Sequence, residues 1–214
     1  MSGTKASSVW RWLREYLGIP QRGRRLPIVD SESLRHFLET RSSHVAQTSL
    51  YGYVRTRAGT RYPELFENDE FIESINIAKW QLWLACLSDL AVYAGGLIQH
   101  RTDESPAAVG ALVSSVVEEV LAAAGVPPDA GDAFETGADS VRNRLVGIDW
   151  VEVTDDEEPF SESPAALAKW APIVDELKQY DTEIVRNSVR FRWQEVRRDL
   201  RRDLDAHAVL KTVP

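Results

Sequence analysis

The sequence predicts an all-α protein, a bundle of five to six helices around one long buried central helix at about residues 69–98. The stretch from Phe71 to Ile98 is the most apolar part of the chain, and its apolar residues cover more than one side of a helix. Such a helix has to be buried among others. Apolar stripes at helical spacing follow helix-capping residues elsewhere. The predicted caps are Asp30, Asn68, Ser105, Asp129 and Ser163.

The first segment, residues 1–28, is predicted to be a basic amphipathic docking segment with a short helix that ends at Gly18 and Pro20. A helix of about nine residues is not stable alone in water, so its apolar side must rest on something. The protein's own core, a partner protein and a membrane surface are the three alternatives. The residues expected to dock are Trp10, Arg11, Trp12, Leu13, Arg14 and Tyr16.

Residues 29–214 are predicted to form a single helical domain. After the central helix, Ser105 and Pro106 start a further helix, because proline is favoured at the first helical position. A long C-terminal helix is expected to end near Ala208, with an apolar stripe that starts at Ile184 or Val185. The arginines beside this stripe have acidic residues three or four positions away, which favours a salt-bridged surface over a nucleic-acid site.

An acidic stretch at residues 147–163 has no helical period and is predicted to be a solvated loop with Trp150 and Phe160 as anchors. Charge is segregated along the chain: residues 1–62 carry 11 Lys/Arg against 4 Asp/Glu, and residues 63–162 carry 4 against 21. The basic start is therefore expected to dock on the chain's own acidic part or on an external anion.

The composition, 43% hydrophobic and 27% charged, is that of an ordinary soluble protein. Cys86 is the single cysteine, which fits a reducing compartment, and the first residues lack the apolar core of a signal peptide. The central helix is long enough to cross a bilayer, but each of Lys79 and Asp89 would cost about 2.5 to 3.5 kcal/mol there. We expect a cytoplasmic protein, with a peripheral position at the inner membrane as the alternative.

Tyrosines and arginines are densest between residues 49 and 62, next to the central helix. This pattern predicts a pocket for a small molecule or an anion near Lys79 and Arg55. The alternative is that the charges pair internally, Asp89 with Arg41 or Arg55, and Lys79 with an acid of residues 64–73 or with Glu118 or Glu119. The predicted lining is Arg41, Tyr51, Arg55, Lys79 and Asp89.

Catalytic and metal-binding motifs are absent from the sequence. The four histidines have no metal-ligand spacing, and no nucleophile elbow, P-loop or dinucleotide-binding motif occurs. Ser42 and Ser43 adjoin His44, but neighbouring residues on a helix point in different directions. We therefore predict no catalytic residue, no metal and no cofactor.

The segment LETRSSHVAQTSLYGYVRTRAGTRYPELFENDEFIESINIAKW resembles a group of uncharacterised bacterial helical proteins that sometimes carry the label esterase, over about residues 37–97. The resemblance implies a hydrolase without assigning a catalytic residue. Three functions are therefore considered. The first is a non-catalytic interaction or assembly factor that uses Trp10, Trp12 and the C-terminal helix to bind a protein partner or a membrane complex. The others are a small-molecule binder and a hydrolase. A second copy of the chain is also an allowed partner, and nucleic acid is not expected.

Overall fold

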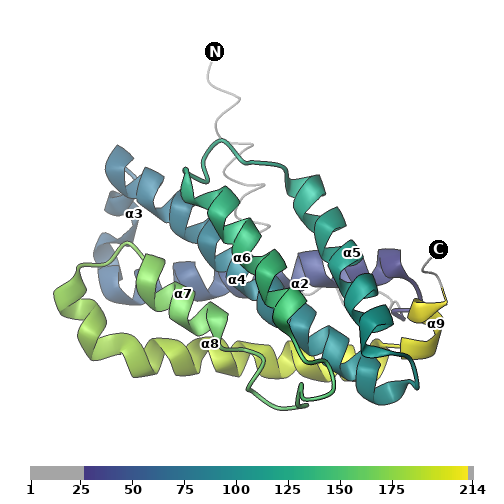
Figure 1. The fold of residues 1–214 in the computed structure, drawn as a ribbon. Helices are drawn as coiled ribbons and strands as arrows, with labels where there is room; N and C mark the ends of the chain where they lie inside the picture. Colours follow the sequence, from purple (N-terminus) through teal and green to yellow (C-terminus); the bar gives the residue numbers. More distant parts are fainter. Residues whose placement is uncertain (1–26, 212–214) are drawn as a thin grey trace.

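The computed structural model describes residues 27–211, and within them it is an all-α bundle around a central helix, which confirms the predicted fold class (Figure 1). The predicted N-terminal helix lies outside the described residues. The helices of nine or more residues are α2 (Ser31–Ala58), α4 (Asp69–Arg101), α5 (Pro106–Ala124), α6 (Ala133–Gly147), α7 (Glu162–Trp170) and α8 (Asp175–Asp203). The short elements are η1 (Gly59–Arg61), α3 (Tyr62–Leu65) and α9 (Ala206–Leu210).

Helix α4 is the central helix, and it packs against α2, α5, α6 and α7. From Leu82 to Ile98 only Ala85 is not fully buried, because apolar residues cover almost every side of this helix. By length and composition alone, α4 and α5 could each cross a membrane, but 94% of the apolar window of α4 is buried by the rest of the chain.

Three of the five predicted helix caps are confirmed. The side chains of Asp30, Asn68 and Ser105 each accept a hydrogen bond from a backbone N–H in the first turn of α2, α4 and α5. The predictions for Asp129 and Ser163 are wrong, because both side chains bond to α4 instead. These two departures mark polar contacts that tie other segments to the central helix.

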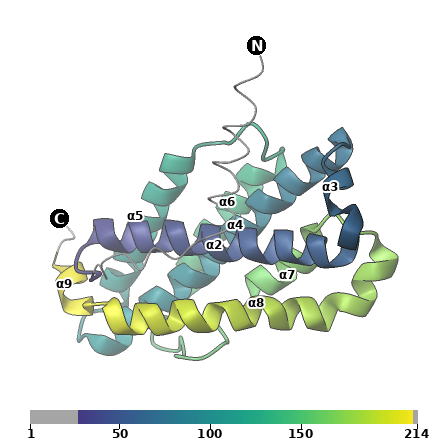
Figure 2. The same ribbon diagram turned by 180° about the vertical axis from the view of Figure 1, so that it is seen from behind.

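Helices α2 and α8 lie side by side and run in opposite directions across one face of the bundle (Figure 2). Helix α8 confirms the predicted long C-terminal helix but ends at Asp203, earlier than expected. Ile28 pairs with the backbone at this end: its N–H donates to Asp203 O at 2.8 Å, and its carbonyl accepts from Asp205 N at 2.9 Å. This pairing fixes the start of the described chain beside the end of α8.

The acidic loop between α6 and α7 was predicted to be solvated, but its two aromatic side chains are buried in the core. Trp150 and Phe160 anchor it as predicted, with exposed fractions of 4% and 1%. Trp150 lies against Gly95 of α4 and Gly110 of α5, where an added Cβ would overlap its indole ring. The glycines therefore admit a loop tryptophan close to the helix backbone.

Candidate functional site

The five residues of the predicted pocket lie in separate surroundings, and the structure does not bring them together. Tyr51 is buried in the core with an exposed fraction of 7%, whereas Arg55 is exposed on α2. Arg41, Lys79 and Asp89 each pair with a charge on a different helix or loop. The sequence predicted one polar cluster, but the three paired residues belong to three separate ion-pair networks around the bundle.

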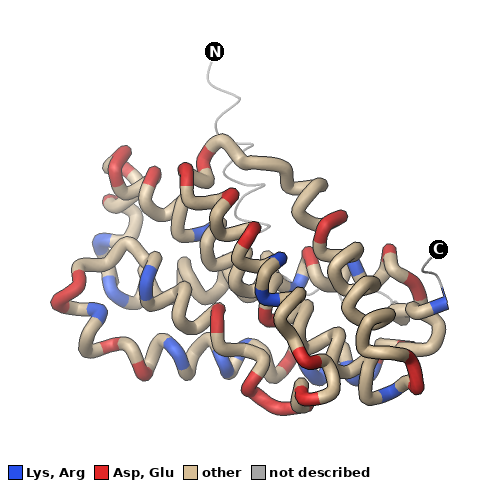
Figure 3. The backbone as a smooth tube through the Cα atoms, viewed as in Figure 1, with Lys and Arg blue, Asp and Glu red and all other residues tan. Residues whose placement is uncertain are grey.

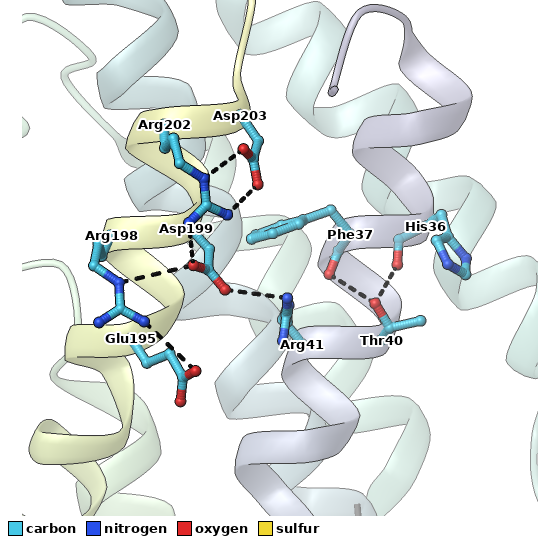
Figure 4. Close-up of polar contacts among 9 residues, drawn as sticks. All are labelled: His36, Phe37, Thr40, Arg41, Glu195, Arg198, Asp199, Arg202 and Asp203. Atoms are coloured by element: carbon cyan, nitrogen blue, oxygen red, sulfur yellow. Dashed lines mark hydrogen bonds and ion pairs between the residues drawn. The ribbon is translucent and has the colours of Figure 1, made fainter. Parts of the chain in front are cut away.

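Arg41 belongs to a surface network that joins α2 to α8 (Figure 4). Its Nη2 lies 3.2 Å from Asp199 Oδ2, and the same carboxylate lies 3.1 Å from Arg202 and 3.9 Å from Arg198. Asp199 is mostly buried and faces these three cations, while Arg202 also bonds to Asp203. The network clamps two antiparallel helices, and its guanidinium groups are already engaged.

Lys79 pairs with Asp129 in the loop before α6, at 2.9 Å, and not with the acids that the sequence indicated. The other oxygen of Asp129 accepts from the Trp80 indole N–H at 2.8 Å. Partial burial acts to raise the pKa of Asp129, but the bonds to Lys79 and Trp80 together outweigh it and hold the pKa below its ordinary value. The carboxylate thus fastens the α5–α6 loop to the central helix.

Asp89 is fully buried, and its predicted partners were wrong, because it pairs with Arg144 of α6 at 2.7 Å. It also accepts from the backbone N–H groups of Glu162 and Ser163 and from the Ser163 hydroxyl at 2.6 Å. Burial raises the pKa of the Asp89 carboxyl, and the Arg144 and Ser163 bonds oppose the rise. The carboxylate receives the first N–H groups of α7, as expected of an anion at a helix N-terminus.

A serine joins this network to α8. Trp193 Nε1 donates to Ser163 Oγ at 3.0 Å, and both residues are buried. The network consequently links α4, α6, α7 and α8 through one carboxylate. Its donors are all committed to internal partners, so the arrangement locks four helices together and offers no free nucleophile or base.

A fourth network attaches α2 to the first half of α8. Asp181 accepts from the Tyr53 hydroxyl at 2.9 Å and from the guanidinium group of Arg57. The bonds to Arg57, followed by the bond to Tyr53, hold the pKa of Asp181 below its ordinary value. On the same helix pair, burial raises the pKa of Tyr53 to about 12.

We expect the protein to lose stability at high pH because of Tyr53 and Tyr93. Burial followed by a hydrogen bond to an aspartate raises the pKa of each phenol to about 12, the aspartates being Asp181 and Asp155. The unfolded chain loses these protons near the ordinary pKa of about 10, whereas the folded protein keeps them until the pH approaches about 12. The free energy of unfolding is therefore unaffected below pH about 10 and falls as the pH rises toward about 12. Urea unfolding across this range should show a shallower fall in Tyr93→Phe. An unchanged slope in that variant would contradict the assignment.

The serine–histidine group of α2 forms no reactive pair. Ser43 Oγ donates to the backbone carbonyl of Glu39 at 2.8 Å, and Ser42 is buried in the core. Within residues 27–211, no hydrogen bond joins His44 to either serine, and no group of His, Cys, Asp and Glu could hold a metal ion.

The surface that stands out is the outer face of α8. Its inner stripe is buried as predicted, with Val185 in the core, but Ile184 points outward with an exposed fraction of 70%. Leu177, Tyr180 and Phe191 share that outer face, with exposed fractions of 41%, 77% and 71%. We call these four residues the α8 stripe. Their spacings of 3, 4 and 7 form a second helical pattern in the sequence, which the inner stripe obscured.

Charge is ordered along the same helix. The first half of α8 is net acidic and the second half net basic, with charges of both signs in each (Figure 3). Glu183 pairs with Arg186 and Arg198 with Glu195 within the helix, whereas no ion pair is found for Glu176 or Arg190 among the described residues. The surroundings of the apolar stripe are therefore net negative near Glu176 and net positive near Arg190. The predicted docking residues Trp10, Arg11, Trp12, Leu13, Arg14 and Tyr16 lie outside the described residues. Comparisons of the chain with protein-family models, curated proteins and solved structures find no match.

Proposed function

We propose that the chain is a non-catalytic interaction factor of the cytoplasm that binds an amphipathic helix of a protein partner along α8. The observation that carries the proposal is the α8 stripe, in which three of four large apolar side chains are at least 70% exposed. Scattered exposed apolar residues are ordinary on a protein surface, but a row at helical spacing is the pattern that receives another helix.

The dimensions of the stripe favour a helical ligand. Leu177 and Phe191 are fourteen residues apart, about 21 Å at the rise of an α-helix, which corresponds to roughly four turns of a bound helix. A peptide that binds as an added β-strand would need unpaired backbone donors and acceptors on the receiving surface, and the backbone of a helix interior offers none.

Charge order specifies the partner further. The first half of α8 is net acidic and the second net basic, so a complementary helix carries a basic residue opposite Glu176 and an acidic residue opposite Arg190. A helix with uniform positive or negative charge would meet like charges in one half. An antiparallel second copy of α8 has the same charge order as the complementary helix, so self-association is an outcome that the test must separate.

Site-specific photo-crosslinking in the native host tests the proposal. A photoreactive phenylalanine analogue replaces Tyr180 in the full chain, and the matched control carries it at Val146 on α6, which is 86% exposed outside the stripe. We expect one discrete adduct from position 180 and none from position 146. Mass spectrometry should place the crosslink in an amphipathic helix with the charge order described above.

A second substitution makes the result specific to the stripe. Ile184→Glu, on the exposed side of α8, should abolish the adduct and leave the helical circular dichroism spectrum unchanged. An adduct that contains two copies of this chain would show that α8 binds a second copy and not a partner protein, and would overturn the proposal. The same adducts from both crosslinker positions, or an adduct that survives Ile184→Glu, would also overturn it.

A further inference from the structure

A groove lies between α6 and α7, with α4 as its floor. Its volume is about 630 Å³, and Leu84 and Ala85 form the apolar part of the floor. Cavities that hold small ligands usually measure about 300 to 1,000 Å³. The groove is on a different part of the molecule from the α8 stripe, and none of its lining residues belongs to α8.

Small side chains keep the groove open. Gly137 and Ser140 line the wall on α6, and Ala165 and Ala166 line the wall on α7. Gly137 also lets α6 approach the floor, because an added Cβ would lie 2.8 Å from a methyl carbon of Leu84. Larger residues at these places would fill the space that the two helices leave between them.

A buried polar group in the floor lacks a partner. Gln81 lines the groove with an exposed fraction of 8%, and its Nε2 has no hydrogen-bond acceptor among residues 27–211. Buried amide groups in native proteins are nearly always hydrogen-bonded, so an unpaired one at the base of a groove requires an explanation. The nitrogen itself is covered, so a half-turn of the amide, which exchanges its nitrogen and oxygen, is needed to present it to an acceptor atom on a bound molecule.

One end of the groove has a positive charge without a counter-ion among the residues that the structure describes. Lys169 lines it from the last turn of α7, where its ammonium group lies 4.8 Å from the centre of the Trp170 ring. Within the described part of the chain, no carboxylate pairs with Lys169, whereas Arg144 at the other end is neutralised by Asp89. Glu162 lies seven residues from Lys169, about 10 Å along α7, and so does not face the same end.

We propose that this groove binds a small apolar anion: a molecule with an aromatic or short aliphatic body, an acceptor atom that meets Gln81, and one carboxylate or sulfonate at Lys169. The apolar body covers Leu84 and Ala85 between the small-residue walls, and the Trp170 ring borders the anionic end. The site needs no partner protein and is independent of binding at α8.

Two related dyes test the proposal on the full chain. 1-Anilinonaphthalene-8-sulfonate has an aromatic body and one anionic group, and N-phenyl-1-naphthylamine is the same body without the sulfonate. Both fluoresce more strongly in an apolar site. We expect both to bind the wild-type protein. Ala166→Trp should abolish the binding of both because it fills the groove.

Charge is tested with Lys169→Met, which keeps most of the side-chain length. This variant should weaken the anionic dye by roughly two- to fivefold, the scale of an exposed ion pair, and leave the neutral dye unchanged. Ile184→Glu should affect neither dye, which separates the groove from the α8 stripe. Equal weakening of both dyes in Lys169→Met, or binding that survives Ala166→Trp in a folded variant, would overturn the proposal. So would the absence of binding to the wild-type protein.

Discussion

Replacing Asp89 by alanine is expected to lower the free energy of unfolding by about 3–5 kcal/mol, the usual effect of removing one partner of a buried ion pair. The variant leaves Arg144, whose side chain is 19% exposed, without its counter-charge. It also removes the acceptor for Ser163 Oγ and for two backbone N–H groups of α7. Because native proteins are stable by only about 5–15 kcal/mol, this is a large fraction of the total. Urea unfolding followed by circular dichroism measures the loss.

Asp129→Ala is the matched control for Asp89→Ala. Asp129 also forms an ion pair with a helix residue, but its side chain is 42% exposed, so water replaces its bonds to Lys79 and Trp80. Exposed pairs contribute about 0–1 kcal/mol. We expect Asp89→Asn to fall between the two variants, since the amide keeps an acceptor oxygen but loses the charge. Equal effects of Asp89→Ala and Asp129→Ala would mean that the Asp89 network does not lock the helices as described.

The partner of Asp89 shows where sequence reasoning stops. The position of Asp89 among apolar residues indicated that it was buried and paired, and the structure bears this out. Its partner is 55 residues away on α6, and nothing in the local spacing distinguishes Arg144 from other arginines. Helical periodicity determines which side of a helix is buried, but the packing of distant helices determines which charges meet.

The same distinction explains the remaining successes and errors. Asp30, Asn68 and Ser105 are confirmed as caps because capping is a local interaction within one turn. Asp129 and Ser163 were wrong because a stronger tertiary partner on α4 was available to each. On α8, the sequence left Ile184 and Val185 as alternatives for the buried stripe, and only the position of α2 and α7 beside the helix leaves Ile184 outside.

Because Trp150 anchors the acidic loop on α4, Gly95→Ala should have opposite effects on stability in the presence and in the absence of Trp150. Trp150→Ala is expected to lower the free energy of unfolding by about 3–5 kcal/mol, because it removes a large buried side chain. Gly95→Ala in the wild type should also be destabilising, by about 1–3 kcal/mol, since the new Cβ overlaps the Trp150 ring. A loop held only by its charged residues would show neither effect.

In the Trp150→Ala background, Gly95→Ala should instead stabilise the protein. The indole ring is then gone, and what remains is the preference of a helix interior for alanine over glycine, about 0.5–1 kcal/mol. Gly147→Ala is the control, because an added Cβ at this last residue of α6 meets nothing within 4 Å and should act alike in both backgrounds. Urea unfolding of the four Gly95 and Trp150 combinations gives the interaction energy directly. If Gly95→Ala changes stability equally with and without Trp150, the loop tryptophan does not rest on the central helix.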